Sequence, residues 1–505
     1  MVALVRSCTL VGIDAVGVDV ECVVQAGQLP SYSVVGLAAP SVKEGGVRIR
    51  SALRACSHDL PLKRVTINLA PADLRKAGCA LDLPVALSTL IGDGLYDGAV
   101  LDQLIVLGEL GLDGSLRPVP GVLAAAMLAR ERGARGVLVP DACADEALVV
   151  DGIEVYGARH LADAIAALAG DAELPAPSRA SPSRRRRHAV GVDMAEVRGQ
   201  QVARHAIEIA VAGGHNVLLA GPPGTGKTML ARRIATVLPA MTRGEALETT
   251  KVYSALGLAD GLVAERPFRS PHHTISGAAL LGGGSQPRAG EISLAHNGVL
   301  FLDELPEFSR AAIEGLRQPL EERAVTINRI HGALRLPASF LLVAAANPCP
   351  CGWLGSGVRE CTCGPGSVDR YRARMSGPLL DRIDLQVHVE PVTLAELRSP
   401  NPTEPSSAMR ERVSAARERQ RARLAPWGLG CNAEMPSSVV RAVCKLDAAS
   451  ETELAQLVDH QRLITARGVD RLIKTARTVA DLLGQDAIDP GALREAAAFR
   501  TELAA

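Results

Sequence analysis

The feature that most constrains the fold is the run Gly221-Pro-Pro-Gly-Thr-Gly-Lys-Thr228. An apolar run, Asn216–Ala220, precedes it, and a segment with helical spacing, Met229–Leu238, follows it. Glycines let such a loop curl so that its N–H groups point at phosphate oxygens. A lysine and a threonine at its end suit the phosphates and Mg²⁺ of a nucleoside triphosphate. The sequence therefore predicts an ATP site in an α/β domain with a parallel sheet, formed by Gly221, Pro222, Pro223, Gly224, Thr225, Gly226, Lys227 and Thr228.

Two further apolar runs end in polar side chains. Gly298–Leu302 leads into Asp303 and Glu304, and Phe340–Ala346 leads into Asn347. We expect Asp303 to hold Mg²⁺ together with Thr228, and Glu304 to orient and deprotonate the attacking water. Asn347 would hold that water or the γ-phosphate. The alternative for Asn347 is a turn residue before Pro348.

Two polar, proline-rich breaks divide the chain of 505 residues, a length that suggests about three domains. We expect a first domain at 1–170, a linker at 171–189, an ATPase core at 190–397 and a helical domain at 398–505. The first piece mixes strand-like runs with Ala/Leu-rich helical runs, as an α/β domain does. The linker contains four consecutive arginines, and it is either a solvated segment or an arm that contacts anions.

Charge balance and residue composition limit the kinds of partner and surroundings that the sequence suggests. Net charge is zero, but residues 1–170 hold 14 Lys and Arg against 19 Asp and Glu, so the remainder carries a net +5. This balance weakly favours an anionic partner for the second part. Aromatic residues are only 2%, which argues against binding single strands by stacking bases on rings. No run of 18 apolar residues and no signal-peptide pattern is present, so we expect a cytoplasmic protein without a membrane partner.

Four of the 11 cysteines are clustered. They form two Cys-x-Cys pairs separated by nine residues, at Cys349, Cys351, Cys361 and Cys363. Four thiolates at close spacing favour a tetrahedral, structural zinc site with no open position for water. Two disulfides and four unligated thiols are the alternatives, and a reducing compartment disfavours the disulfides.

Longer motifs carry a family resemblance. The segments RPFRSPHHTIS (266–276), GEISLAHNGVLFLDELPEF (290–308), LRQPLEER (316–323), GPLLDRIDL (377–385) and TARGVDRLIKTARTVADLL (465–483) resemble the AAA+ family, in its magnesium-chelatase-like YifB/ComM branch. The resemblance covers nearly the whole chain. It implies an N-terminal Lon-protease-like, S5-like α/β domain, a P-loop AAA+ domain and a C-terminal helical lid.

The resemblance also assigns roles to arginines. Arg382 is similar to the arginine finger that reaches the γ-phosphate bound by the neighbouring subunit of a hexamer. Its alternative is a surface ion pair with Asp381 or Asp384. Arg467 is similar to the sensor-2 arginine of the lid, with Arg471 as its rival.

A hairpin is expected between Ala324 and Leu336, with its turn at Arg329–Gly332. In this branch of the family such hairpins project into the pore of a ring, which would place Arg329 and His331 against DNA. An ordinary exposed hairpin is the alternative.

The Lon-like piece departs from the Lon pattern. Lon uses a serine and a lysine, but here the serine position falls on Cys79 or Ala80 and the lysine position on about Leu123. Leucine cannot act as a base and alanine cannot be a nucleophile. We therefore expect a regulatory or assembly domain, which would bind a protein partner, and not a peptidase.

The resemblance implies an ATP-hydrolysing ring motor. Its first interpretation is a DNA-remodelling helicase that drives branch migration during natural transformation or recombination. A magnesium-chelatase-type subunit and a regulatory ATPase acting on a protein partner are the alternatives. The absence of a metal-binding DxSxS motif from the sequence favours the DNA interpretation.

Overall fold

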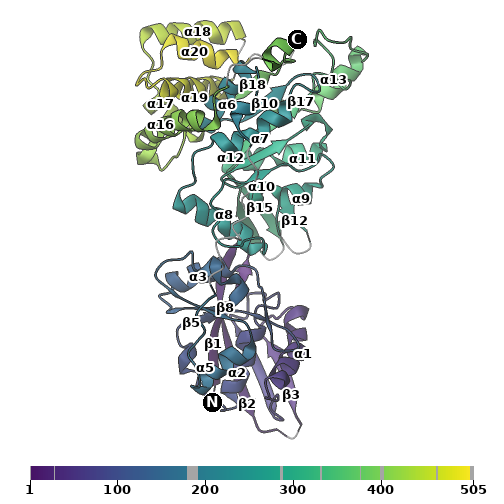
Figure 1. Ribbon diagram of the computed structural model, residues 1–505, viewed down its shortest axis with the longest axis vertical. Helices are drawn as coiled ribbons and strands as arrows, with labels where there is room; N and C mark the ends of the chain where they lie inside the picture. Colours follow the sequence, from purple (N-terminus) through teal and green to yellow (C-terminus); the bar gives the residue numbers. More distant parts are fainter. Residues whose placement is uncertain are drawn as a thin grey trace. The chain divides into compact units, whose positions relative to one another are not determined.

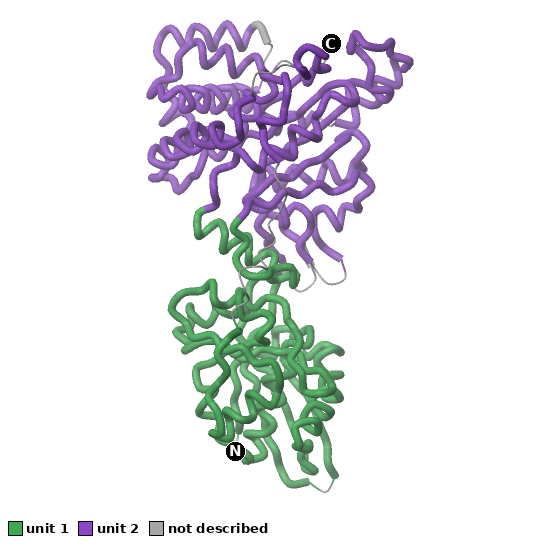
Figure 2. Tube along the Cα trace, viewed as in Figure 1, with its two compact units in different colours: residues 1–187, 242–264 green, residues 188–241, 265–505 purple. Residues whose placement is uncertain are grey.

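The structure is a computed structural model that describes residues 2–27, 29–178, 192–284, 288–329, 332–375, 377–398, 403–461 and 465–500. It divides into two compact units (Figure 2). Unit 1 comprises residues 1–187 and 242–264, and unit 2 comprises residues 188–241 and 265–505. None of the helices in these described parts is long and apolar enough to cross a membrane.

Unit 1 contains two main sheets. The larger sheet has the order β1-β2-β4-β3, in which β3 and β4 are parallel and the other pairs antiparallel; the strands are β1 (Val2–Val11), β2 (Asp14–Gln25), β4 (Arg64–Ala70) and β3 (Ser31–Val35). The smaller sheet is parallel, with β8 (Gly136–Pro140) between β5 (Leu104–Val106) and β9 (Glu154–Ala158). A short hairpin joins β6 (Glu109–Leu110) to β7 (Leu116–Arg117). Alternate residues of β4 are buried, as expected for a sheet that is covered on one face.

Helices cover these sheets (Figure 1); they are α1 (Pro40–Ala55), α2 (Asp82–Gly92), α3 (Val122–Glu131), α4 (Ala144–Ala147) and α5 (Leu161–Ala169). The apolar helix α2 is buried against β1 and β2. The strand-like and helical runs expected in this piece, such as Arg64–Leu69 and Val122–Arg132, correspond to β4 and α3.

One helix of unit 1 comes from the middle of the chain. Helix α8 (Arg243–Ala255) lies beyond the phosphate-binding loop in sequence, yet it packs on α3. Its Leu247 contacts the apolar cluster that contains Leu123. The predicted division places residues 242–264 in the ATPase core, whereas in the structure they belong to the same compact unit as residues 1–187. The packing of α8 on the apolar side chains of α3 accounts for this difference.

Unit 2 is built on a five-stranded parallel sheet of order β11-β14-β17-β10-β18. The strands are β11 (Phe268–Arg269), β14 (Val299–Leu302), β17 (Leu341–Ala346), β10 (Val217–Ala220) and β18 (Leu385–His388). Every residue of β10, β14 and β17 is buried, which is typical of parallel strands covered on both faces. The parallel sheet confirms the predicted fold class.

The helices of unit 2 fall into an inner set and a C-terminal set. The inner set includes α6 (Gln201–Gly213), α7 (Lys227–Val237), α9 (Gly277–Leu281), α10 (Glu291–Leu294), α11 (Arg310–Gly315), α12 (Arg317–Glu322), α13 (Pro365–Ala373), α14 (Gly377–Leu380) and α15 (Leu394–Leu397). The C-terminal set is α16 (Ser406–Leu424), α17 (Ser437–Val443), α18 (Ala448–Gln461), α19 (Ala466–Leu482) and α20 (Pro490–Ala498), coloured light green to yellow in Figure 1. Val217 of the sheet and Leu472 of α19 belong to one apolar core, in which α16 packs on α6 and α7 and α19 packs on α6.

Two hairpins extend unit 2. The predicted hairpin is present as β15 (Ala324–Arg329) and β16 (Gly332–Pro337), with Arg329 paired to Gly332. A shorter hairpin joins β12 (Gly282–Gly283) to β13 (Arg288–Ala289). The two are neighbours, since Ile327 Cδ1 lies 3.3 Å from where a Cβ on Gly282 would be.

Candidate nucleotide site and cysteine cluster

The phosphate-binding loop connects the end of β10 to the first residue of α7. Gly224 and Gly226 have φ angles of 80° and 90°, in the left-handed region that favours glycine. A Cβ on Gly221 would lie 2.2 Å from the carbonyl oxygen of Val389. The glycines are therefore required by backbone geometry, and the loop places Lys227 at the helix N-terminus.

Lys227 is buried and satisfied by oxygen atoms. Its Nζ donates to the carbonyl oxygens of Gly221 at 2.7 Å and Pro222 at 2.8 Å. It also donates to Oδ1 of Asn347 at 3.1 Å, which joins residues 120 positions apart. Burial lowers the pKa of Lys227, and the nearby carboxylates of Asp303 and Glu304 oppose that shift. An incoming triphosphate would supply the anion that the buried ammonium lacks.

Thr228 and Asp303 form the second pair. The Thr228 hydroxyl donates to Oδ2 of Asp303 at 2.7 Å. A hydroxyl and a carboxylate oxygen at a phosphate-binding loop are hard ligands of the kind that Mg²⁺ prefers, so these residues fit the ion.

Glu304 follows Asp303 in an unusual backbone conformation. Its φ angle is 53°, and its N–H donates to Oδ1 of Asp303 at 3.0 Å. Its half-exposed side chain has Oε2 3.4 Å from Nδ1 of His273. His273 lies in the segment RPFRSPHHTIS, but nothing in its spacing marks it as a site residue. Its role depends on a contact across 31 positions that no local pattern indicates.

The arginines lie at the other edge of the sheet. Arg382 comes before β18, at the amino ends of the parallel strands, whereas Lys227 follows the carboxyl end of β10. The Nη2 of Arg382 pairs with Oε1 of Glu321 at 2.6 Å, and Nη1 of Arg467 lies 3.5 Å from the same oxygen. The structure thus brings Arg382 and Arg467 together and does not bring either to Lys227.

The alternative interpretation of Arg382 is a surface ion pair with Asp381 or Asp384, but in the structure Arg382 pairs with Glu321 instead. Asp384 is engaged elsewhere: it accepts from the N–H of Asn216 at 2.9 Å and lies 3.7 Å from Nε of Arg471. Burial acts to raise the pKa of Asp384, but the imidazole of His215, whose Nδ1 lies 3.8 Å from Oδ2 of Asp384, and the nearby Arg471 hold that pKa at about 2.

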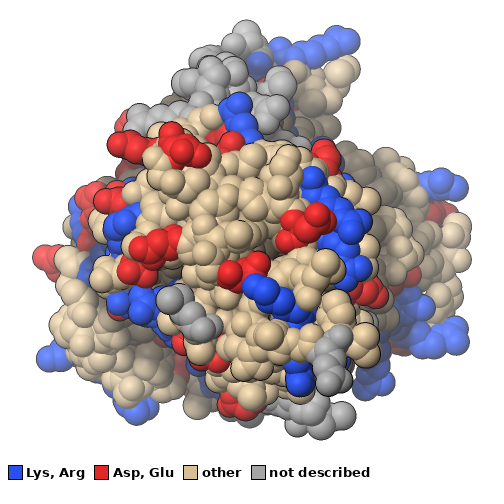
Figure 3. Space-filling model, turned by 90° about the horizontal axis from the view of Figure 1, so that it is seen from below, with Lys and Arg blue, Asp and Glu red and all other residues tan. Residues whose placement is uncertain are grey.

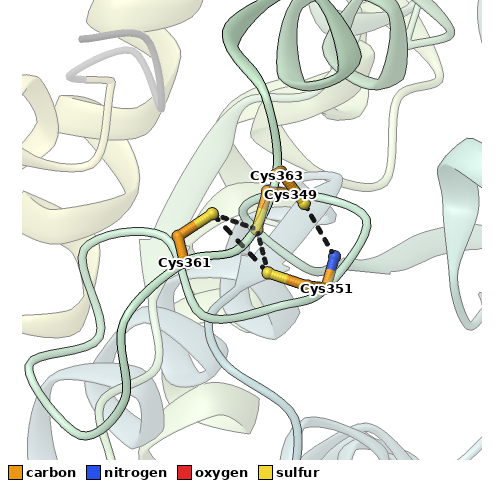
Figure 4. Close-up of side chains that lie close together, drawn as sticks. All are labelled: Cys349, Cys351, Cys361 and Cys363. Atoms are coloured by element: carbon orange, nitrogen blue, oxygen red, sulfur yellow. Dashed lines mark hydrogen bonds between the residues drawn. The ribbon is translucent and has the colours of Figure 1, made fainter.

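The four cysteines converge on one point (Figure 4). The sulfurs of Cys349, Cys351 and Cys361 are 3.4 to 3.6 Å apart, and all four ligand atoms lie within 4.8 Å of one another. Four sulfurs around zinc, at about 2.3 Å from the metal, are about 3.8 Å apart. All four thiols are free. Backbone N–H groups of Cys351 and Leu354 donate to sulfurs of the cluster, as is common around bound thiolates. The donor set and its spacing therefore fit Zn²⁺.

The cysteine loop lies against the phosphate-binding loop. Gly352 has a φ of 83°, and a Cβ there would lie 2.6 Å from Cδ of Pro223. The first cysteine, Cys349, is two residues beyond Asn347, the partner of Lys227. The cluster is thus connected to the nucleotide site by both sequence and packing.

Two predicted DNA contacts are less fully described. Arg329 is the last residue of β15. His331 lies outside the described residues.

The Lon-like positions of unit 1 lie in different surroundings. Leu123 is fully buried, in the first turn of α3. Burial raises the pKa of the Cys79 thiol, with Arg48 acting in the opposite direction. The thiol is therefore protonated at neutral pH and is a poor nucleophile.

Comparisons with known proteins agree with this site. The profile described as "Magnesium chelatase, subunit ChlI" matches residues 193–397, "Subunit ChlI of Mg-chelatase" matches 20–143, and "Magnesium chelatase, subunit ChlI C-terminal" matches 403–500. The uncharacterised protein YifB of Escherichia coli K12 is 40% identical over 503 residues, 99% of this chain and 97% of its own. The competence protein ComM of Haemophilus influenzae is 40% identical over 507 residues, with the same coverage. Lon protease 2 of Bacillus subtilis is 29% identical over 181 residues, 31% of this chain and 32% of its own.

A P-loop on a parallel five-stranded sheet, with Lys227, Thr228 and Asp303 in place, defines an AAA+ ATPase. The chain belongs to the magnesium-chelatase-like YifB/ComM family. Membership implies ATP hydrolysis with Mg²⁺ and an oligomeric assembly.

Proposed function

We propose that this protein is a ring-forming AAA+ motor that hydrolyses ATP to remodel DNA, as in branch migration linked to natural transformation or recombination. The observation that carries the ATPase part is the convergence of Lys227, Thr228, Asp303 and Asn347 at one loop. In this proposal Lys227 binds the β- and γ-phosphates, and Thr228 and Asp303 hold Mg²⁺, which offsets phosphate charge. Glu304 takes the proton of the attacking water, and Asn347 orients that water or the γ-phosphate.

The assembly part rests on the position of the arginines. Arg382 and Arg467 lie at the sheet edge opposite the loop that binds phosphate, so neither side chain serves the nucleotide of its own chain. In a ring, that edge of one subunit faces the nucleotide of the next. Arg382 then acts as the arginine finger and Arg467 as the sensor-2 residue, while Glu321 holds both in the absence of a neighbour's phosphate. A hexamer is the ring size of the family.

The DNA part rests on the β15–β16 hairpin and on the name of the Haemophilus relative, a competence protein. A motor that accepts any sequence should contact phosphates and not base edges. In the view of Figure 3, Lys and Arg side chains alternate with Asp and Glu around a broad uncharged area. Positive and negative charges are thus mixed on this face. We assign DNA contact to the β15–β16 hairpin, which carries Arg329 and His331 near its turn.

The test measures ATPase rate and DNA affinity over a range of salt concentrations. Wild type should be stimulated by forked or single-stranded DNA, and its affinity should fall steeply with salt and vary little with sequence. Arg329→Ala should weaken DNA binding and reduce the salt slope, while basal ATPase survives.

Arg335→Ala is the matched control. Arg335 lies on the same hairpin and pairs with Thr326, three register positions farther from the turn than Arg329. Equal losses in the two variants would contradict the assignment of Arg329 to the hairpin tip. If wild type with ATP binds no DNA at any salt concentration, the DNA proposal is wrong and a regulatory ATPase with a protein partner takes its place.

A further inference from the structure

Asn216 is the residue directly before β10, and its backbone is bonded to the segment that enters the neighbouring strand β18. Its carbonyl oxygen accepts from the N–H groups of Asp384 and Leu385, both at 3.0 Å. Its own N–H donates to Oδ2 of Asp384 at 2.9 Å. Asn216 therefore joins the amino ends of two parallel strands of the sheet.

The side chain of Asn216 contacts two further segments. Its Nδ2 donates to the carbonyl oxygen of Arg382 at 3.0 Å, and its Oδ1 accepts from the N–H of Leu342, in β17, at 3.0 Å. A carboxamide offers a donor and an acceptor on one planar group, whereas an ionised aspartate of the same shape can only accept. The two bonds together therefore require an amide at this position.

The bond from Asn216 attaches the main chain of Arg382 to the sheet. Arg382 lies in the connection between α14 and β18. Its N–H donates to the carbonyl oxygen of Leu379 at 2.8 Å, and its Nη1 donates to that of Pro378 at 2.6 Å. Both of these acceptors belong to α14, which has only four residues. Asn216 thus ties the connection to the sheet at Arg382 itself.

The reach of the Arg382 guanidinium depends on that main-chain position. The side chain is only 12% exposed, and it pairs with Glu321. A small displacement of the main chain would therefore withdraw the guanidinium from the surface. A misplacement of about 1 Å in the groups that position a reacting centre can cost about 100-fold in rate.

We propose that Asn216 is a positioning residue that holds Arg382 where it reaches the phosphate bound by the neighbouring subunit. This inference rests on the proposed role of Arg382 as the arginine finger. The phosphate-binding loop begins at the opposite, carboxyl end of β10. Loss of the Asn216 carboxamide should therefore impair a subunit as the donor of the arginine and spare it as a binder of ATP.

The experiment measures ATP binding and steady-state ATPase of Asn216→Ala, alone and in mixtures. Alone, the variant should bind ATP with the wild-type Kd and lose about 10- to 100-fold in kcat, because its arginine is present but misplaced. Mixed with Lys227→Ala, it should recover part of the activity, because its intact loop meets a correctly held Arg382. Mixed with Arg382→Ala, it should stay at the level of the two components, because neither subunit supplies a held arginine.

Asn216→Asp provides the same test with a smaller change to the packing. It keeps an oxygen for the N–H of Leu342 and removes the N–H that bonds the carbonyl oxygen of Arg382. It should show the same difference between the two mixtures.

Asn432→Ala is the matched control. Asn432 is a fully buried asparagine of the same unit, and its Nδ2 donates to Oγ1 of Thr478 at 3.0 Å and to Oδ2 of Asp481 at 2.8 Å. Its substitution removes amide bonds to α19 and leaves Arg382 in place, so its two mixtures should recover activity equally. A wild-type kcat in Asn216→Ala, a weakened ATP affinity, or equal activity in its two mixtures would overturn the proposal.

One further mixture separates the two possible failures. Lys227→Ala with Arg382→Ala should recover activity if ATP sites are shared between subunits. If it does and the Asn216 variants behave equally with both partners, Arg382 remains the arginine finger and Asn216 is only a structural residue. If that mixture recovers nothing, the assignment of Arg382 is wrong, and the positioning role of Asn216 is wrong with it.

Discussion

Each unit begins a helix directly after a glycine in the left-handed conformation. In unit 2 the glycine is Gly226, with φ 90°, and the helix is α7; in unit 1 it is Gly121, with φ 82°, and the helix is α3. A helix N-terminus of this kind favours a negative charge in front of it. The two units differ in what occupies that position.

In unit 1 the position is filled by the chain itself. The hydroxyl of Ser254, at the end of α8, accepts from the N–H of Leu123 at 3.3 Å and donates to the buried carboxyl of Glu146 at 2.5 Å. The carbonyl oxygen of Ser254 accepts from the N–H of Gly121 at 2.8 Å. In unit 2 the N–H groups in front of α7 belong to the phosphate-binding loop that leads to Lys227. The N-terminus of α3 is therefore capped by Ser254 of the same chain, whereas the N-terminus of α7 is left for a phosphate ligand.

The largest expected effect on function comes from Lys227, the first residue of α7, and we contrast it with Leu123, the second residue of α3. Lys227→Ala should abolish ATP binding or hydrolysis, because it removes the buried cation from the phosphate-binding loop, while the fold is retained. Leu123→Ala should leave ATP binding intact and lower the free energy of unfolding of unit 1 by ~2–5 kcal/mol, because it opens a cavity in a fully buried position. Nucleotide-binding titration and calorimetry on both variants measure this contrast.

The same Lys227 variant tests whether ATP sites are shared. Mixed with Arg382→Ala, which should also be inactive, it should recover part of the activity, because one mixed interface combines an intact loop with an intact arginine. Mixtures that stay as inactive as their components would contradict the assignment of Arg382 to the neighbour's nucleotide.

The next expected effect concerns the cysteine cluster, whose loop packs against the phosphate-binding loop. We expect about one Zn²⁺ per chain, bound by Cys349, Cys351, Cys361 and Cys363. Cys361→Ser should lose the metal and depress ATPase activity, because the cysteine loop packs on Pro223 and begins next to Asn347. Elemental analysis and ATPase rates provide the measurement, with Cys444→Ser as a control at a buried cysteine outside the cluster. Equal zinc in wild type and Cys361→Ser, or none in either, rejects the site.

The smallest expected effect concerns Glu146, which accepts a hydrogen bond from Ser254, the residue that caps α3. Burial raises the pKa of Glu146 to about 7, from an ordinary value of 4.5, while Ser254 and the Leu123 N–H act in the opposite direction. The folded state therefore binds a proton more tightly than the unfolded state does. The stabilisation is fully present below about pH 4.5 and is lost as pH rises through about 7.

Wild type should accordingly lose stability in unit 1 between pH 5 and pH 8, on the order of 2 kcal/mol relative to Glu146→Gln. Calorimetric scans at several pH values would show this slope in wild type and not in Glu146→Gln. Glu131→Gln makes the same change at an exposed position of α3 and should keep the wild-type slope. A slope that persists in Glu146→Gln would assign the pH dependence to another group.

Local patterns predicted the parts of the site that are built from consecutive residues. The strand–loop–helix order around Lys227 and the carboxylates after β14 are adjacent in sequence, and so are the two cysteine pairs. The hairpin at Ala324–Pro337 was equally local.

Contacts between distant segments could not be predicted in the same way. The pairing of His273 with Glu304 depends on the order of strands in the sheet, and the docking of Ser254 on α3 joins residues 131 positions apart. The sequence also could not show that Arg467 lies beside Arg382 and not beside Lys227, because helix packing sets that position.

The return of residues 242–264 to unit 1 has a consequence for the order in which the protein is made. During synthesis, residues 1–187 leave the ribosome well before α8, so α3 waits for its cap while the entire phosphate-binding loop is translated. Unit 1 is completed only when residue 264 has emerged, because in the sequence the segment 188–241 of unit 2 lies between the two parts of unit 1. A single cut in the chain therefore cannot release either unit whole, and a truncation at the linker would leave α3 without the helix that covers it.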